Sequence, residues 1–133
     1  MISYNSIKNF RTRLSDLLKT KRGVYSNLPD EIKREFEEAD IEKIRNNRDM
    51  ILMQNEAIIV KLRLPDRRMQ LSKANGYRLI YMVSTIAERV VFLDIYPKRG
   101  PMQQLDIEAK DLTRLLVEFN SEDENGTLEE YKF

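Results

Sequence analysis

The sequence predicts an α+β fold, in which an antiparallel sheet of three to four strands carries two N-terminal helices on one face and is followed by a C-terminal helix. Two observations support this. Apolar residues recur at helical spacing near both ends of the chain, whereas between residues 57 and 96 they alternate with a period of two. A length of 133 residues suits one domain, which we place at residues 1–119, followed by an acidic, flexible tail at residues 120–133.

The N-terminal third is predicted to contain a short edge strand at residues 1–4 and then two helices. The first helix starts at Ile7, because apolar residues recur every three or four positions as far as Leu18. The second opens at residues 28–31, Leu-Pro-Asp-Glu, since proline and acidic residues are favoured in a first helical turn. The pattern leaves open whether this helix runs to Asn47 or breaks near Asp40.

Three antiparallel strands are predicted to follow, at residues 58–64, 77–83 and 90–96. Turn-forming residues separate them: Pro65-Asp66 and Asn75-Gly76 lie between the first two strands, and a short turn at residues 86–88 joins the last two. Pro97 ends the third strand, and a final helix is expected to start at Asp106, which is a good N-cap residue.

The composition excludes several classes of function. The chain contains no histidine, which removes His-based triads and the commonest metal ligand, and no cysteine, which removes disulfides and thiolate zinc sites. No apolar run is long enough to span a membrane, and the N-terminus lacks the apolar core of a signal peptide. We therefore expect a cytoplasmic protein that uses neither a metal nor a cofactor.

Positive charge is concentrated in the predicted strands. Residues 57–99 contain nine Lys and Arg residues against three carboxylates, a local charge of +6 in a chain whose overall charge is +1. Like charges on one sheet face repel, so this excess favours a bound polyanion. The acidic residues 120–133 either form a solvated terminus or fold over the basic face and mimic RNA.

The run GYRLIYMVSTIAERVVFLDIYPKR, residues 76–99, resembles the core of the RelE family of toxins from bacterial toxin–antitoxin modules. The similarity covers residues 57–119, and the order of predicted elements is also that of the family. The resemblance implies a RelE-like toxin that enters the ribosomal A site and cleaves mRNA without a metal, by attack of a ribose 2′-OH on the adjacent phosphate. It also implies the ribosome, mRNA and a cognate antitoxin as partners.

The resemblance assigns roles to four basic residues. Arg78 matches the arginine that stabilises the phosphate, and Arg99 resembles a second arginine that is a candidate acid. Lys61 and Arg63 match a basic pair, of which Lys61 is the better candidate base. Further RNA contacts are expected from basic residues nearby: Arg67, Arg68, Lys73 and Lys98.

Two departures from the family pattern leave other functions open. Leu105 stands where a tyrosine often completes the site, and Arg63 replaces a lysine, although guanidinium is a poor proton acceptor. The alternatives are a ParE-like toxin that acts on DNA gyrase and a catalytically inactive domain that binds RNA or a partner. Structural roles also remain open, such as pairing of Arg78 with Asp94.

Overall fold

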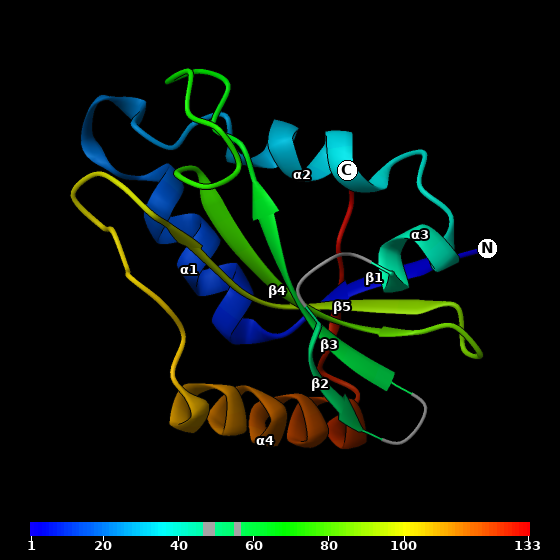
Figure 1. Ribbon diagram of the computed structural model, residues 1–133. Coiled ribbons are helices and arrows are strands. Elements are labelled where there is room, and N and C mark those ends of the chain that lie inside the picture. Colours follow the sequence, from blue (N-terminus) through cyan, green and yellow to red (C-terminus); the bar gives the residue numbers. More distant parts are fainter. Residues whose placement is uncertain (47–49, 55–56) are drawn as a thin grey trace.

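A computed structural model of the chain describes residues 1–46, 50–54 and 57–133 (Figure 1). Helices and strands follow one another as expected for an α+β protein, with the N-terminal helices before the main strands and one long helix after them. The elements in chain order are β1 (Ser3–Ser6), α1 (Lys8–Leu18), the 3₁₀ turn η1 (Lys21–Gly23), α2 (Leu28–Phe36), α3 (Ile41–Arg45), β2 (Met50–Gln54), β3 (Ala57–Leu64), β4 (Tyr77–Ser84), β5 (Arg89–Pro97), α4 (Ala109–Asn125) and β6 (Glu129–Glu130).

The strands form one mixed sheet in the order β2-β3-β4-β5-β1-β6. The three predicted strands, β3, β4 and β5, are antiparallel neighbours, which confirms the α+β class and a mainly antiparallel sheet. β1 was expected at an edge, but it lies between β5 and β6 and runs parallel to β5. β2 was not predicted, because the sequence Met-Ile-Leu-Met-Gln lacks the alternation that identifies a strand.

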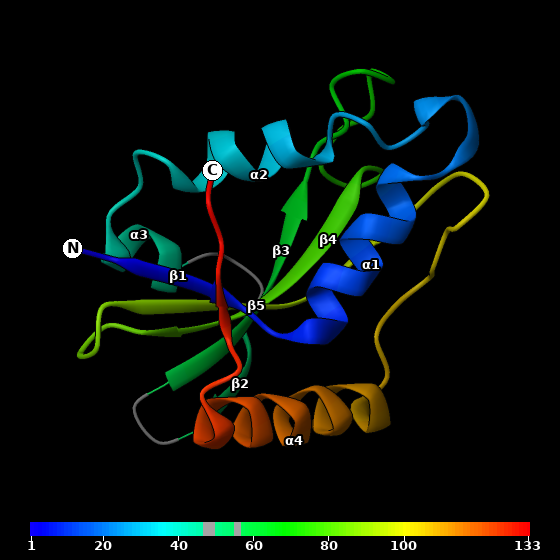
Figure 2. The ribbon, with the colours of Figure 1, turned by 180° about the vertical axis from the view of Figure 1, so that it is seen from behind.

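Helices cover both faces of the sheet. Helices α2 and α3 lie on one side and α4 on the opposite side, while α1 packs beside β5 (Figures 1 and 2). Aromatic rings fill the space beneath α1 and α2, where Phe92 of β5 contacts Phe10 and Phe36. Tyr77 and Tyr81 of β4 are also buried, and they serve packing rather than an exposed site. No helix in the described ranges has both the length and the apolar character needed to cross a membrane.

The second predicted helix breaks near Asp40, which was one of the two readings left open. α2 ends at Phe36, and α3 begins at Ile41 with Asp40 as its N-cap. The Asp40 carboxylate accepts a hydrogen bond from the backbone amide of Lys43 at 2.8 Å, which satisfies a donor that the first helical turn leaves free. Asn47, the other proposed end, lies outside the described residues.

The C-terminal region differs from the expectation in two ways. α4 begins at Ala109, and Glu108 rather than Asp106 is its N-cap. Residues 120–133, expected to be a flexible tail, instead continue α4 as far as Asn125 and then form β6, which pairs with β1. Tyr131, just after β6, packs its ring edge-on against Phe92 at a centroid separation of 4.9 Å.

Acidic side chains hold the end of α4 against the start of α1. Ile7, the N-cap residue of α1, has an apolar side chain that cannot accept a hydrogen bond. The carboxylates of Glu122 and Glu118 take this role from α4, accepting from the amides of Lys8 at 3.0 Å and Asn9 at 2.9 Å. Carboxylates are favourable near a helix N-terminus, so charges that suggested a solvated tail contribute to the fold.

Replacing Glu122 by alanine is expected to lower the free energy of unfolding by about 1–2 kcal/mol, because the first amides of α1 lose their acceptor. Glu124→Ala is the matched control, since Glu124 is exposed on the same helix. Chemical denaturation of both variants tests the assignment. Equal losses in the two variants would show that the Glu122 carboxylate does not cap α1.

Candidate nucleic-acid interface

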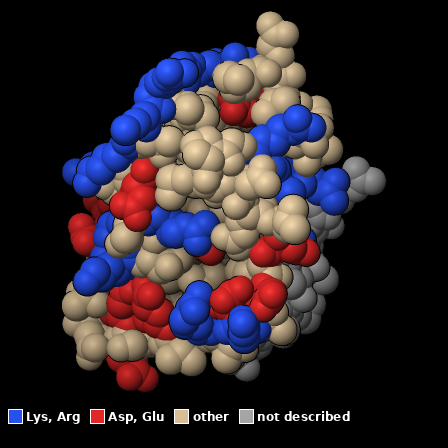
Figure 3. All heavy atoms as spheres, turned by 90° about the vertical axis from the view of Figure 1, so that its left-hand side faces the viewer, with Lys and Arg blue, Asp and Glu red and all other residues tan. Residues whose placement is uncertain are grey.

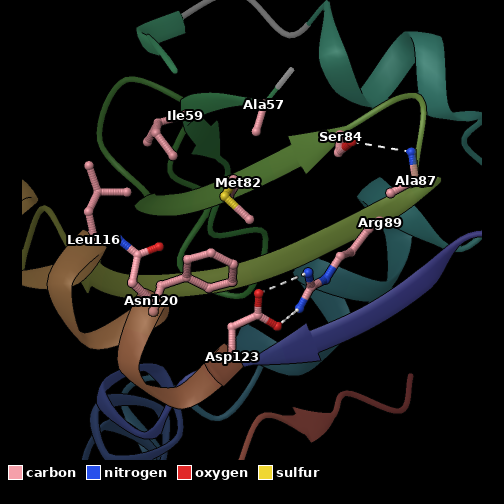
Figure 4. Close-up of a pocket in the computed structure, with 10 residues that line it drawn as sticks. Ala57, Ile59, Met82, Ser84, Ala87, Arg89, Leu116, Asn120 and Asp123 are labelled. Atoms are coloured by element: carbon pink, nitrogen blue, oxygen red, sulfur yellow. Dashed lines mark hydrogen bonds and ion pairs between the residues drawn. The ribbon is translucent and has the colours of Figure 1, made fainter. Parts of the chain in front are cut away.

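Helix α4 covers one part of the sheet face opposite α2 and α3. Between α4 and the sheet lies a cavity of about 240 Å³, which is lined by Leu116 and Phe119 of α4, Ile59 of β3 and Met82 of β4. Figure 4 shows Leu116, Ile59 and Met82 around it. An ion pair of 2.6 Å between Arg89 of β5 and Asp123 of α4 lies beside this cavity (Figure 4). The same sheet face continues beyond the cavity, toward the end of β3 and the start of β4, and there it carries basic side chains.

Four basic side chains meet on this continuation of the face. Strand register places Arg63 of β3 opposite Arg78 of β4, and Lys61 two residues earlier on the same side of β3. Lys98 follows the last residue of β5. Burial lowers the pKa of the Lys98 ammonium, and the charges of Arg78, Lys61 and Arg63 lower it further, against the opposing effect of Asp106. We refer to Lys61, Arg63, Arg78 and Lys98 as the cationic cluster.

Two residues that sequence reasoning did not assign to a site complete this region. Tyr96 of β5 lies opposite Arg78 in the sheet, and its hydroxyl donates to the Asp106 carboxylate at 3.5 Å. The same carboxylate lies 3.2 Å from the Lys61 ammonium. Burial raises the pKa of the Tyr96 phenol, and Asp106 raises it further, so Tyr96 keeps its proton. The alternation of β5 could have placed Tyr96 on the basic face, but a loop residue such as Asp106 carries no such signal.

The Arg78 side chain has a structural role. It is only 7% exposed, and its terminal nitrogens donate to the backbone carbonyls of Lys73 at 2.9 Å, Ala74 at 3.0 Å and Tyr77 at 3.1 Å. These bonds hold the turn that precedes β4 against the strand. Its positive charge still contributes to the field of the cluster, as its effect on Lys98 shows.

We expect Arg78→Met to lower the free energy of unfolding by about 2–3 kcal/mol, because three carbonyls lose a charged donor. Arg63→Met should cost less than about 1 kcal/mol, since Arg63 is exposed. Urea denaturation measures both values, and limited proteolysis should cut residues 67–75 faster in the Arg78 variant alone. Similar stability of the two variants would contradict the structural role of Arg78.

The other predicted site residues lie outside the cationic cluster. Arg99 lines a separate cavity of about 190 Å³ with Tyr25 and Tyr77, and its carbonyl accepts from the Tyr25 hydroxyl at 2.9 Å. Arg67 forms an ion pair with the buried carboxylate of Glu31 on α2. Two residues take part in backbone interactions of the same region: the Arg68 guanidinium donates to the Gly23 carbonyl, and the carbonyl of exposed Lys73 accepts from Arg78.

Asp106 is placed against the cationic cluster, whereas several other acidic groups pair with cations elsewhere. Figure 3 shows the side of the molecule that carries residues 98–108, where Asp and Glu groups interrupt the Lys and Arg groups. Asp94, considered as a partner for Arg78, lies 3.7 Å from the Arg13 guanidinium. The acidic C-terminal residues do not reach the cluster as the charge pattern suggested: Asp123 pairs with Arg89, and Glu129 pairs with Arg11.

This arrangement offers a phosphodiester fixed positive charge, a protonated phenol and a lysine whose pKa is lowered. In the described part of the chain, no group of three or more His, Cys, Asp or Glu side chains is placed to hold a metal ion. Comparison of the chain with protein-family models, with curated proteins and with solved structures gave no match.

Proposed function

We propose that this protein is a RelE-like toxin that binds ribosome-associated mRNA in the A site and cleaves it without a metal. The observation that carries the proposal is the convergence of four basic residues on one part of a sheet face: Lys61 and Arg63 of β3, Arg78 of β4 and Lys98, which follows β5. The similarity of residues 57–119 to the RelE family supports the same function and implies a cognate antitoxin that neutralises the toxin.

The proposed reaction is attack of a ribose 2′-OH on the adjacent phosphate, which forms a 2′,3′-cyclic phosphate and releases a 5′-OH. In place of Lys61, we assign acceptance of the 2′-OH proton to Lys98, because burial and neighbouring cations lower the pKa of Lys98. The Lys61 ammonium is a candidate donor of the proton that the leaving 5′ oxygen takes up. Arg63, which is exposed, would stabilise the charge that develops on the phosphate.

Two observations favour the alternative of a ParE-like toxin that acts on DNA gyrase. The terminal nitrogens of Arg78 bind backbone carbonyls, and Arg99 lines a cavity outside the cationic cluster. Both residues were assigned to phosphate chemistry by the resemblance. A domain that binds RNA or a partner without cleaving it has the same support.

Induction of the protein in bacterial cells, followed by mapping of mRNA 5′ ends, distinguishes these functions. The nuclease predicts new ends in phase with codons for the wild type and few for Lys98→Met. Lys33→Met is the matched control, because Lys33 lies on α2 and pairs with Glu37. A DNA-damage response without new mRNA ends would support the gyrase alternative, and neither effect would leave the inactive binding domain.

A further inference from the structure

We infer that Lys61, Tyr96 and the backbone amide of Ile107 form a subsite for one phosphate oxygen, and that the Asp106 carboxylate occupies it until RNA displaces it. The inference rests on the proposed function, in that it names the position that a phosphodiester takes within the cationic cluster. It also assigns a regulatory role to residues 98–108, which carry Asp106 across the basic face.

Three donors meet at one oxygen atom of Asp106. Oδ1 of Asp106 accepts from the Lys61 ammonium at 3.2 Å, from the Tyr96 hydroxyl at 3.5 Å and from the Ile107 amide at 2.8 Å. An ammonium, a phenol and a backbone amide that converge on one oxygen are the donors that a phosphate oxyanion requires. The Ile107 amide, Lys61 and Lys98 all lower the pKa of Asp106, which shows the positive potential at this position.

Asp106 is not needed as a helix cap. Glu108 is the N-cap of α4 and forms a reciprocal capping box with Asp111, so the helix start is satisfied without Asp106. The Asp106 carboxylate instead contacts Lys61 of β3 and Tyr96 of β5. Its contacts are therefore best explained by its charge, which the cationic cluster attracts.

The contact is also easily broken. The Asp106 side chain is 64% exposed, and exposed ion pairs contribute little to stability because water competes for both partners. The Tyr96 side chain of β5 is fully buried, so its hydroxyl stays in place when the Asp106 carboxylate moves away. Binding of RNA also gains free energy because the RNA releases its counterions, which favours RNA over a single carboxylate.

Binding of a fluorescein-labelled single-stranded RNA oligonucleotide to purified protein, followed by anisotropy at fixed salt, tests the inference. Asp106→Asn should tighten binding about fivefold, the upper range for an exposed ion pair. Asp123→Asn is the matched control, because it makes the same charge change at a carboxylate that pairs with Arg89 beside the α4 cavity. The control should tighten binding less than twofold.

Addition of Tyr96→Phe to the Asp106→Asn protein should weaken binding by about threefold or more, because one donor of the subsite is lost. Equal tightening by Asp106→Asn and Asp123→Asn would reflect net charge alone and would overturn the inference, as would unchanged affinity in the Asp106 variant. The assay needs no ribosome and no cleavage. Tighter RNA binding by the Asp106 variant alone, without mRNA cuts in cells, would support the subsite and contradict the nuclease. Cuts in mRNA without this selective tightening would support the nuclease and contradict the subsite.

Discussion

Lys98→Met is expected to reduce the single-turnover rate of mRNA cleavage on programmed ribosomes by about 100-fold, the usual effect of removing a general acid or base. Lys98 combines a lowered pKa with a position beside Arg78, Lys61 and Arg63. Loss of its amine removes both a proton acceptor and a positive charge near the phosphate. The protein itself should remain folded, because Lys98 is only partly buried.

Two further variants separate the contributions of Lys98. Lys98→Arg keeps the charge but cannot readily lose a proton, so it should bind RNA normally and cleave as slowly as Lys98→Met. Lys33→Met, on α2, should cleave at the wild-type rate. Normal cleavage by Lys98→Arg would limit Lys98 to a charge effect, and normal cleavage by Lys98→Met would remove it from the site.

Gly76→Ala is expected to lower the free energy of unfolding by about 3 kcal/mol or more, the upper range for an overpacked site. A Cβ atom at this position would lie 2.1 Å from the carbonyl oxygen of Leu64, 2.8 Å from the carbonyl carbon of Pro65 and 2.9 Å from the amide nitrogen of Asp66. All three are backbone atoms, so the clash cannot be relieved by turning a side chain. Urea denaturation measures the loss.

Gly126→Ala provides the control for this substitution. Gly126 ends α4 at a φ of 67°, and an added Cβ would meet nothing within 4 Å, so only backbone strain of about 1 kcal/mol is expected. If both alanine variants lose the same stability, close backbone packing does not explain Gly76. A larger loss of unfolding free energy in Gly76→Ala than in Gly126→Ala would show that Gly76, the first residue of the Gly-Tyr-Arg run, is required for the ends of β3 and β4 to approach.

Local sequence pattern predicted the elements whose periodicity is clear. β3, β4 and β5 lie within two residues of their predicted bounds, because β3 alternates apolar and basic residues and the other two strands are short apolar runs bounded by turn residues. The pattern could not give the place of β1 inside the sheet, since strand order depends on contacts distant in sequence. It also mistook residues 120–133 for a tail, because acidic residues that cap α1 look the same in sequence as solvated ones.

The candidate site was also predicted only in part, because contacts between residues distant in sequence leave no local pattern. Lys61, Arg63 and Lys98 were predicted to contact RNA from their charge and from the family resemblance, and the structure brings the three together on one part of the sheet face. The ion pair of Arg67 with Glu31 could not be predicted from the sequence pattern, because Glu31 lies 36 residues away in the chain. Asp106 resembled an N-cap in sequence, and only the three-dimensional arrangement brings its carboxylate to Lys61.

The salt dependence of RNA binding tests most directly whether the cationic cluster contacts phosphates. Each lost phosphate contact reduces the magnitude of the negative slope of log affinity against log salt by about 0.7 for a single strand. Lys61→Met, Arg63→Met and Lys98→Met should each reduce the magnitude of the slope by about this amount, whereas Lys33→Met should leave it unchanged. Slopes in all three cluster variants equal to that of the Lys33 control would contradict the account.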